Sequence, residues 1–529
     1  MTKKSMRYLA PVLAMSMVLS LTACGGGEKA AETTAAAAGG EAKQTEAAAN
    51  AGGSAAPAKD TLIIATANET PSMTTNLHNA VAGDYMNEMT HSGLFKQIED
   101  MSIVPDLVDT YEVKDDVEWT FKLKQGVKFH NGAELKAADV VASLELCKKS
   151  PEVAQYSKAI ATVEAVDDYT VKIITDGPQS GLLSDLTHHG NCILPADLIA
   201  SGHDFNKEPI GTGPYKFVEW KKGESVTLEA FEDYFNGPAP IKTVIWKVIP
   251  EGSSRTMALE AGEVDLIVEV ESTDVSRLKD NSEITVYQGA GTSHNFMMIN
   301  TEKAPFNNVD FRKAMNCAID KAAIIQVALN GGGSVSDSML PQCFPGATLE
   351  GACSFDVEEA KKYFAASGLN AADCGFDLIC SDDTKLRVGQ VIQSCLKETL
   401  GVDVALQSMD LATYLDVTAT GEYDAAIGGY TSSGMLPYAQ GVWHSESINS
   451  SNKTRTNDPH VDELINKMMA TVDPAENEKI VTELNIYLNE IMPQIALYHR
   501  DNVRAYNADL KGFNLSAGGN TDYSLFSWE

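Results

Sequence analysis

The sequence has 529 residues, with 41 Lys and Arg against 73 Asp and Glu, which gives a formal net charge of −32. Hydrophobic residues make up 44% and charged residues 22%, as is typical of globular proteins. The length predicts two or three lobes rather than one small domain. The negative charge excludes nucleic acid and anionic lipid headgroups as surface partners, but it does not define the charge of a ligand pocket.

The first 24 residues have the organisation of a secretory signal. Three basic residues within the first seven positions precede a short apolar run over 8–21, and small residues follow it. Leu21-Thr22-Ala23-Cys24 resembles the bacterial lipobox, which implies cleavage before Cys24 and diacylglycerol on its sulfur. The alternative is a plain signal peptide with an incidental cysteine. No later stretch approaches the ~18 unbroken apolar residues of a membrane-spanning helix.

Residues 25–59 consist of Gly, Ala, Glu, Thr, Lys and little else. Because such a segment lacks large apolar side chains, it cannot bury enough surface to fold. As a coil it would reach on the order of 30 Å. We therefore predict a tether between a lipid and a folded body that begins at Thr61.

The first half of the body is predicted to be α+β and rich in hairpins. Residues 62–65 form an apolar run typical of a buried strand, and 119–124 alternate apolar and polar residues as a strand with one covered face. Residues 127–129 are expected to return from a turn at 125–126. Two further hairpins are predicted around the turns at 167–168 and 222–223.

From about residue 300 the pattern changes to alternating helices and strands. Apolar residues recur at helical spacing from Phe311 to Leu329. Further helices are predicted to start at a capping box at Asp356 and at Asp473-Pro474, and one helical face runs from Val388 to Cys395. Strands are expected at 402–406 and 494–498.

Nine cysteines are present, and none has zinc-site spacing. Outside the cytoplasm disulfides can form, so Cys343 with Cys353, and Cys374 with Cys380, could each close a short loop. Cys317 and Cys395 lie on apolar helical faces and are predicted to be buried thiols.

Four segments in order resemble the extracellular solute-binding proteins of the oligopeptide/dipeptide/nickel group, family 5. The resemblance covers roughly residue 60 to the end. The segments are Val104-Pro105-Asp106-Leu107 with 119–132 and Ala138-Asp139-Val140, then 211–215 with 233–237, then 258–265, and last Asn300, Pro305-Phe306 and 311–321.

The resemblance implies an α/β periplasmic-binding-protein type II fold with two lobes and an α+β first lobe. The chain would cross between the lobes near 291–300 and near 497–505. The expected boundaries are a signal peptide at 1–23, a lipidated Cys24 and tether at 24–59, lobe I at 60–295 with a subdomain at about 86–205, lobe II at 296–498, and a return to lobe I at 499–529.

The family's ligand contacts imply four cleft segments here, namely 68–73, 187–189, 292–295 and 429–435. In peptide-binding members an Asp in the last loop holds the ligand's α-amino group, whereas this chain has Ser and Thr there. This difference leaves open a neutral or hydroxyl-rich ligand, or a peptide held in another way. The predicted ligand-binding residues are Asn68, Thr70, Met73, His188, His189, Thr292, His294, Tyr430, Thr431, Ser432 and Trp443.

The adjacent pair His188-His189 raises nickel or haem ligation as an alternative. If the pair lay on a strand, the two rings would point to opposite faces, so no metal ligand and no cofactor is predicted. Trp443 could stack on a ligand or pack in the core. No nucleophile elbow or HExxH motif points to a hydrolase, so no catalytic residue is predicted.

The sequence thus predicts a monomeric, extracytoplasmic binding protein of an ABC importer. Lipidated Cys24 would anchor it to the cell membrane, at the cell surface or the periplasmic face, beside the permease subunits. Its ligand would be an oligopeptide or a related small polar solute. The alternatives are a non-peptide ligand such as an oligosaccharide or a nickel chelate, a signalling receptor, and an extracytoplasmic hydrolase.

Overall fold

The computed structural model describes residues 59–349 and 354–529. The predicted signal peptide, Cys24 and almost all of the predicted tether lie outside these residues. Residues 57–529 form one compact unit, and five hydrophobic clusters are built from its own side chains. None of the helices in the described part is long and apolar enough to span a bilayer.

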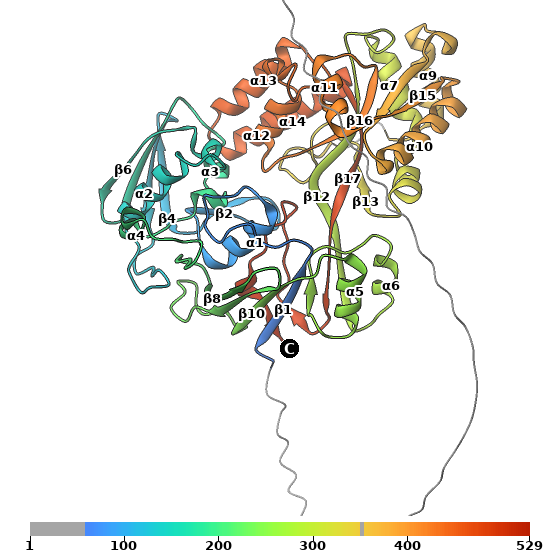
Figure 1. Cartoon of the computed structure of the whole chain (residues 1–529). Helices are drawn as coiled ribbons and strands as arrows, with labels where there is room; N and C mark the ends of the chain where they lie inside the picture. Colours follow the sequence, from blue (N-terminus) through green and yellow to red (C-terminus); the bar gives the residue numbers. More distant parts are fainter. Residues whose placement is uncertain (1–58, 350–353) are drawn as a thin grey trace, which may run out of the picture. The chain divides into compact units, whose positions relative to one another are not determined.

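An eleven-stranded mixed sheet runs through this unit (Figure 1). Its strand order is β15-β14-β16-β12-β17-β11-β1-β10-β9-β8, and β13 pairs with β17 outside this path. The strands are β1 (Thr61–Thr66), β8 (Tyr215–Lys221), β9 (Ser225–Ala230), β10 (Thr243–Val248), β11 (Leu266–Ile267), β12 (Ile284–Ile299), β13 (Gly333–Val335), β14 (Phe376–Cys380), β15 (Val404–Ser408), β16 (Ala425–Thr431) and β17 (Gln494–Asn507).

The long antiparallel strands β12 and β17 join the two lobes (Figure 1). Their pairing is interrupted by a register shift between Ala290 and His294. Beyond this shift β12 pairs with β16 from Ser293 onward, whereas the other end of β17 pairs with β11 at Tyr506. The chain therefore passes between the lobes twice, as predicted. The exact residue boundaries of the lobes stay a prediction.

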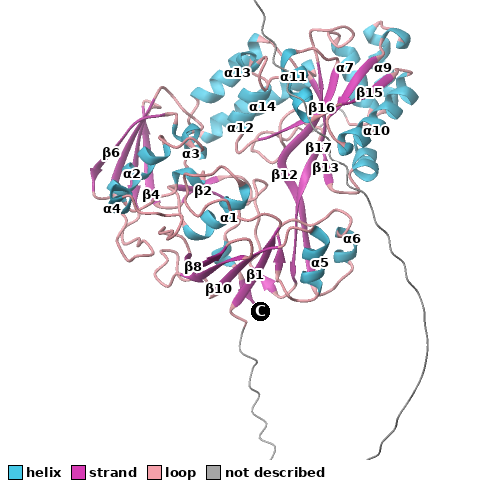
Figure 2. Cartoon of the chain, viewed as in Figure 1, coloured by secondary structure: helices cyan, strands magenta, loops and turns pink. Residues whose placement is uncertain are grey.

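The second lobe is a sheet covered by helices on both faces (Figure 2). Along β12, Met297 and Ile299 pack into one hydrophobic cluster with α7, α9 and α10, whereas Phe296 and Met298 pack into another with α12, α13 and α14. This alternation is what a strand buried on both faces requires. The helices are α7 (Val309–Ala318), α8 (Lys321–Ala323), α9 (Val357–Ser367), α10 (Asp383–Leu400), α11 (Leu411–Thr420), α12 (Met435–Val442), α13 (Pro459–Ala470) and α14 (Pro474–Ile491).

The first lobe repeats this arrangement on the other half of the sheet. Leu62 and Ile64 of β1 face a cluster that includes residues of α1, whereas Ile63 and Ala65 face a cluster that includes residues of α5 and α6. Its helices are α1 (Val81–Thr90), α5 (Gly252–Glu260) and α6 (Val275–Lys279), and a small ribbon is formed by β18 (Leu510–Lys511) and β19 (Ser527–Trp528).

A separate four-stranded sheet, ordered β4-β5-β7-β6, packs with α2. On β5, Trp119, Phe121 and Leu123 are buried, as their alternation predicts. Its elements and neighbours are β2 (Phe95–Gln97), β3 (Ile103–Pro105), β4 (Val108–Lys114), β5 (Glu118–Leu123), α2 (Ala137–Cys147), β6 (Ile160–Asp167), β7 (Thr170–Thr175), α3 (Leu182–Asp185) and α4 (Ala196–Ser201). The remaining short helical turns are η1 (Ala154–Ser157), η2 (His189–Asn191), η3 (Ile324–Ala328), η4 (Ala371–Asp373), η5 (Ser445–Ser447) and η6 (Tyr523–Leu525).

Most predicted elements are confirmed, including β1, the β6–β7 and β8–β9 hairpins, and the helices that begin after Asp356 and Asp473. Two predictions are wrong. Residues 127–129 form no strand, because β5 pairs instead with β4 and β7. The helix expected from Phe311 to Leu329 breaks after α7, where the Asp320 side chain accepts from the Ala323 N–H and starts α8.

The cysteine predictions also need correction. Cys317 is disulfide-bonded rather than a free buried thiol. Cys343, Cys374 and Cys380 are free, so neither short loop proposed for them is closed. Cys395 is a free cysteine, as expected, but it is only partly buried.

Candidate functional site

A cavity of about 1600 Å³ is lined by residues of both lobes. From the first lobe, α1 contributes Asp84, Asn87 and Glu88, and the segment around η2 contributes a second wall. From the second lobe come the end of β16, the loop 432–433 and the start of α12. Of the two strands that cross between the lobes, β12 contributes Thr292 to the described lining of the cavity, and β17 contributes no described residue.

The position of α1 depends on two close backbone approaches. At the end of the helix, a Cβ on Gly211 would lie 2.2 Å from the Thr90 carbonyl oxygen. A Cβ on Gly213 would lie 2.6 Å from the His91 backbone nitrogen. At its start, a Cβ on Gly83 would meet the His78 ring at 2.2 Å. The glycines of the 211–215 motif thus seat the helix that carries Asp84 and Glu88.

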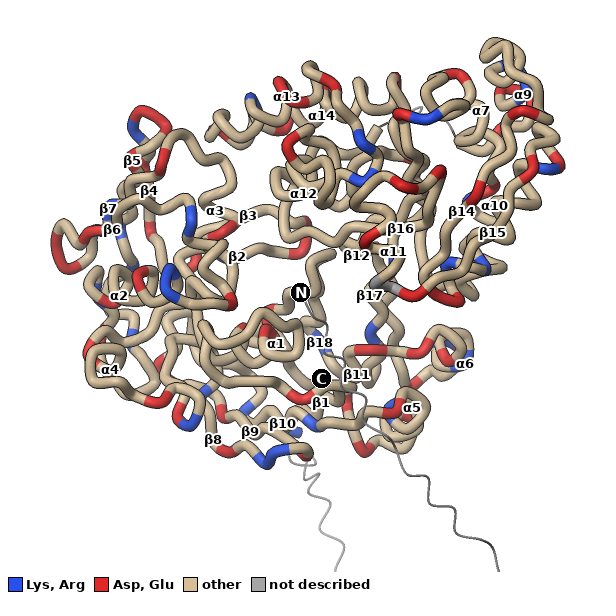
Figure 3. The backbone as a smooth tube through the Cα atoms, turned by 45° about the horizontal axis from the view of Figure 1, so that its top comes forward, with Lys and Arg blue, Asp and Glu red and all other residues tan. Residues whose placement is uncertain are grey.

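Carboxylates dominate the charge of the cavity. Among the described lining residues, acidic side chains outnumber lysines by eight to two, and no arginine is included. Acidic positions on α1 are coloured red on the backbone tube of Figure 3. The acidic residues are Asp84, Glu88, Glu99, Asp100, Asp106, Asp176, Asp185 and Asp522, and the lysines are Lys96 and Lys158.

The buried carboxylates have raised pKa values. Burial raises the pKa of Asp185 to about 7 and that of Asp106 to about 6, although Lys96 opposes the second shift. The pKa of Glu88 is raised well above its usual range by burial and, to a lesser degree, by the neighbouring Asp84. Lys96 is already paired with Asp522 at 2.9 Å, so the cavity retains an excess of carboxylates.

A stack of rings forms part of the first-lobe wall. Tyr156 stacks on His188 with 3.4 Å between ring centroids, His188 lies 4.1 Å from His189, and His189 stacks on His78 at 4.5 Å. The pair His188-His189 does not lie on a strand, because His188 is the N-cap of η2. Both rings therefore lie on the same side. The sequence argument against metal ligation assumed that they would point to opposite faces of a strand.

Six of the predicted ligand-binding residues line the cavity, and five do not. Trp443 and His294 are buried in the second lobe, where His294 Nδ1 lies 2.6 Å from the Tyr438 hydroxyl and its Nε2 lies 3.0 Å from the Ser336 hydroxyl. Ligand contact at all eleven positions stays a prediction. The six are His188, His189, Thr292, Tyr430, Thr431 and Ser432, and the others that do not line the cavity are Asn68, Thr70 and Met73.

Sequence reasoning missed the cavity residues on α1 and α3. Asp84, Glu88 and Asp185 belong to no motif, and the segment that contains α1 has no clear helical periodicity. The one available signal was the pair Gly211 and Gly213, because glycine permits close approach of another backbone segment, but this signal does not identify that segment. Asp522 likewise reaches the cavity only because the chain returns to the first lobe after β17.

The family model for bacterial extracellular solute-binding proteins, family 5 Middle, matches residues 102–451. The chain belongs to this family. Heme-binding protein A of Haemophilus influenzae is 26% identical over 79% of this chain and 82% of the relative. Glutathione-binding protein GsiB of Pectobacterium atrosepticum is 27% identical over 83% of this chain and 87% of the relative.

The fold is likewise that of a type II periplasmic binding protein. The structure of HbpA2 from Haemophilus parasuis covers 89% of this chain and 100% of its own, with a TM-score of 0.82 at 24% identity. The chain is therefore an extracytoplasmic substrate-binding protein of an ABC importer, and its family is one of binding proteins rather than enzymes.

Proposed function

We propose that the chain is a lipid-anchored binding protein that captures an oligopeptide or a related small polar solute. The observation that carries this proposal is that one cavity is lined by α1 and η2 of the first lobe and by 430–433 of the second. Its volume of about 1600 Å³ exceeds the ~300–1000 Å³ of typical small-molecule sites. A small ligand would therefore be enclosed only after the lobes approach each other.

The charge of the cavity supports a ligand with a positive group, such as the free amino group of a peptide. The 430–435 loop supplies no carboxylate for an amine, but Glu88 and Asp185 lie on the first-lobe wall of the same cavity. An ammonium group would stabilise the ionised form of these buried carboxylates. In this proposal the amine is held by the first lobe, and the Ser and Thr hydroxyls contact the rest of the ligand.

Calorimetry of residues 57–529 against a ligand panel tests the proposal. The panel contains di- to hexapeptides with free or acetylated amino termini, oligosaccharides, nickel chelates, glutathione and heme. We expect a free-amine peptide to bind with a Kd of ~10 μM or lower, and its acetylated form to bind more weakly. Heme carries two propionates and no ammonium group, so the acidic cavity predicts weak binding of heme, and glutathione, with two carboxylates against one ammonium group, should bind more weakly than a peptide without net negative charge. A best ligand that is an oligosaccharide or an anion would contradict the peptide assignment.

The lipid anchor is tested separately with the full chain in a bacterial host. We expect the wild-type protein to partition into a detergent phase and the Cys24→Ser variant to remain in the precursor form with its signal attached. Mass spectrometry of the mature amino terminus measures the difference directly. A wild-type terminus without diacylglycerol would contradict the lipid anchor, but it would not affect the proposal about ligand binding.

A further inference from the structure

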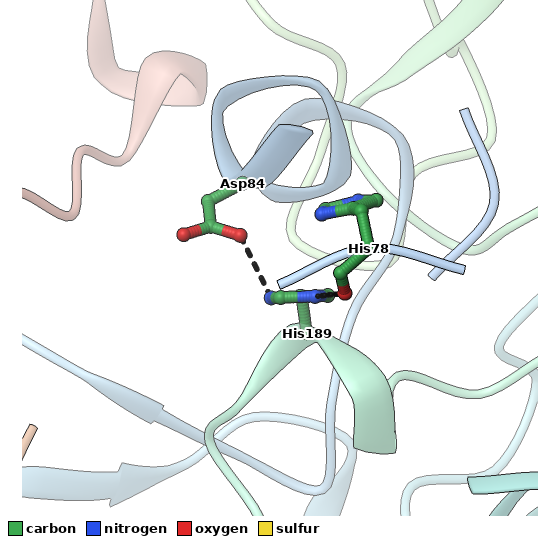
Figure 4. Close-up of side chains that lie close together, drawn as sticks. All are labelled: His78, Asp84 and His189. Carbon is green, nitrogen blue, oxygen red and sulfur yellow. Dashed lines mark hydrogen bonds and ion pairs between the residues drawn. The ribbon is translucent and has the colours of Figure 1, made fainter. Parts of the chain in front are cut away.

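Three potential metal ligands from two distant segments meet on the wall of the cavity (Figure 4). His78 precedes α1, Asp84 lies in the first turn of α1, and His189 begins η2. One ligand atom from each of them lies within 4.8 Å of the other two. Both histidines are buried, whereas the Asp84 side chain is 35% exposed. Such a cluster of two imidazoles and a carboxylate is a donor set that transition metals use.

The hydrogen bonds of His189 fix its tautomer. Its Nε2 lies 3.0 Å from the backbone C=O of His78. Because a carbonyl oxygen can only accept, Nε2 carries the proton, and in the neutral ring Nδ1 has a free electron pair. This electron pair faces Asp84 Oδ1 at 2.8 Å.

The contact between these two atoms is not aligned as a hydrogen bond. Asp84 Oδ1 is buried and has no hydrogen-bond partner among the described residues. A carboxylate oxygen and an unprotonated ring nitrogen repel each other at this distance, so the pair requires a cation between or beside them. That cation is either a proton that the two groups share or a metal ion.

We infer that His78, Asp84 and His189 form a binding site for a divalent transition-metal ion. With bonds of ~2.1 Å, donor atoms 2.8 Å apart subtend ~85° at an ion. This angle suits neighbouring positions of an octahedral or tetragonal ion, such as Ni²⁺ or Cu²⁺, better than a tetrahedral Zn²⁺ site. The three residues belong to one lobe, so this inference does not depend on the proposed transport function.

His78 is the ligand that must move. Its ring is nearly parallel to that of His189, with an interplanar angle of 12°. The nitrogen electron pairs of two stacked parallel rings lie in different planes, so they do not point at one common ion. The ring therefore tilts when both histidines bind one ion. Asn87 can orient it, because the His78 Nε2 lies 2.9 Å from Asn87 Nδ2 while Asn87 Oδ1 has no partner. Turning this amide over lets Nε2–H donate to Oδ1, and Nδ1 then exchanges the hydrogen bond that it accepts from the Ala80 N–H at 3.3 Å for a bond to the metal.

The ion would be accessible to a ligand in the cavity. Asp84 and His189 both line the cavity, so the positions that the protein leaves open face its interior. Water, or an amine or carboxylate of a bound solute, can fill them. A metal at this site would add positive charge to a wall that is otherwise acidic.

Titration of metal-free residues 57–529 with NiCl₂ and ZnCl₂ in a calorimeter at pH 7.5 tests the inference. We expect one equivalent of Ni²⁺ to bind more tightly than Zn²⁺. Asp84→Asn and His189→Ala should each weaken Ni²⁺ binding by ~10-fold or more. Acidification should weaken it, because protons compete with the metal for the ligand atoms.

His460→Gln is the matched control. His460 is 43% exposed and lies 3.3 Å from Glu463, so it forms a histidine–carboxylate pair on the surface. Its replacement should leave the titration unchanged. Ligand-field absorption of the Ni²⁺ or Co²⁺ complex gives a second readout, and circular dichroism verifies that each variant is folded. Absence of stoichiometric binding by the wild-type protein, or wild-type affinity in folded Asp84→Asn and His189→Ala variants, would overturn the inference.

Discussion

Asp185 is a cavity carboxylate whose protonation changes close to neutral pH. Burial raises its pKa from an ordinary value of 3.8 to about 7. The folded state therefore holds this proton more tightly than the unfolded state, so the stability contributed by this group is present at low pH and is lost as the pH rises from about 4 to about 7. A bound cation would reverse that loss, because it stabilises the ionised carboxylate.

This argument predicts pH-dependent binding. The affinity for a free-amine peptide should rise by roughly 10-fold between pH 5.5 and pH 7, because Asp185 ionises over this range while the peptide's α-amino group, with a pKa of about 8, keeps its proton. Asp185→Asn should remove most of this dependence and weaken binding at pH 7. Asp204→Asn, at an exposed carboxylate paired with Lys207, is the control. The same pH profile in wild type and Asp185→Asn would contradict the role of this residue.

Arg312 shows how a buried side chain can hold two distant elements together. Its Nε donates to the Met492 C=O at 2.7 Å, and its Nη1 donates to the Phe306 C=O at 2.6 Å. Nη2 also donates to the C=O of Ile491. The guanidinium thus satisfies carbonyls at the end of α14 that the helix itself leaves unpaired.

Replacement of Arg312 by Met should therefore lower the free energy of unfolding by ~3 kcal/mol, because buried carbonyls lose their donors. Denaturant unfolding measures this change. Arg277→Met is the control, since Arg277 is 49% exposed and makes surface ion pairs, which contribute ~1 kcal/mol or less. Equal losses in the two variants would show that burial is not the cause.

At the level of elements, the seating of α1 on the Gly211 and Gly213 backbone links a structural motif to the cavity. A Cβ at Gly213 would lie 2.5 Å from the Met89 C=O and 2.6 Å from the His91 N. These contacts are with backbone, so the end of α1 would have to move. His91 and Ser92, which line the cavity, would move with it.

Gly213→Ala should lower the free energy of unfolding by ~1–3 kcal/mol and weaken ligand binding. Thermal unfolding and calorimetry measure the two effects. Gly375→Ala is the matched control, because its Cβ would meet only ordinary contacts from 3.4 Å outward. Wild-type stability and affinity in Gly213→Ala would show that this contact does not position α1.

The elements with a local signal were predictable from the sequence, and the contacts between distant segments were not. The hairpins β6–β7 and β8–β9 and the capped helix α14 follow from alternation and cap residues. The break after α7 was missed because apolar spacing continued through the Asp320 cap. The juxtaposition of His78 with His189 has no sequence signal, because the two residues are 111 positions apart.

For the whole molecule, the family resemblance predicted the two lobes and both crossings, which lie on β12 and β17. The sequence charge of −32 did not define the pocket, yet the cavity between the lobes proves to be acidic as well. Three of the four expected cleft segments have residues that reach it, namely 187–189, 429–435 and, through Thr292, 292–295. None of residues 68–73 does so, because Thr70 and Met73 are buried elsewhere in the first lobe.

Hydrogen exchange of residues 57–529, with and without a saturating amount of the best ligand from the panel, is the most direct test of capture between the lobes. The ligand should slow amide exchange in 84–92 and 182–192 of the first lobe and also in 430–440 of the second, because all three segments line the cavity. Slower exchange in one lobe alone, or in neither, would contradict this account.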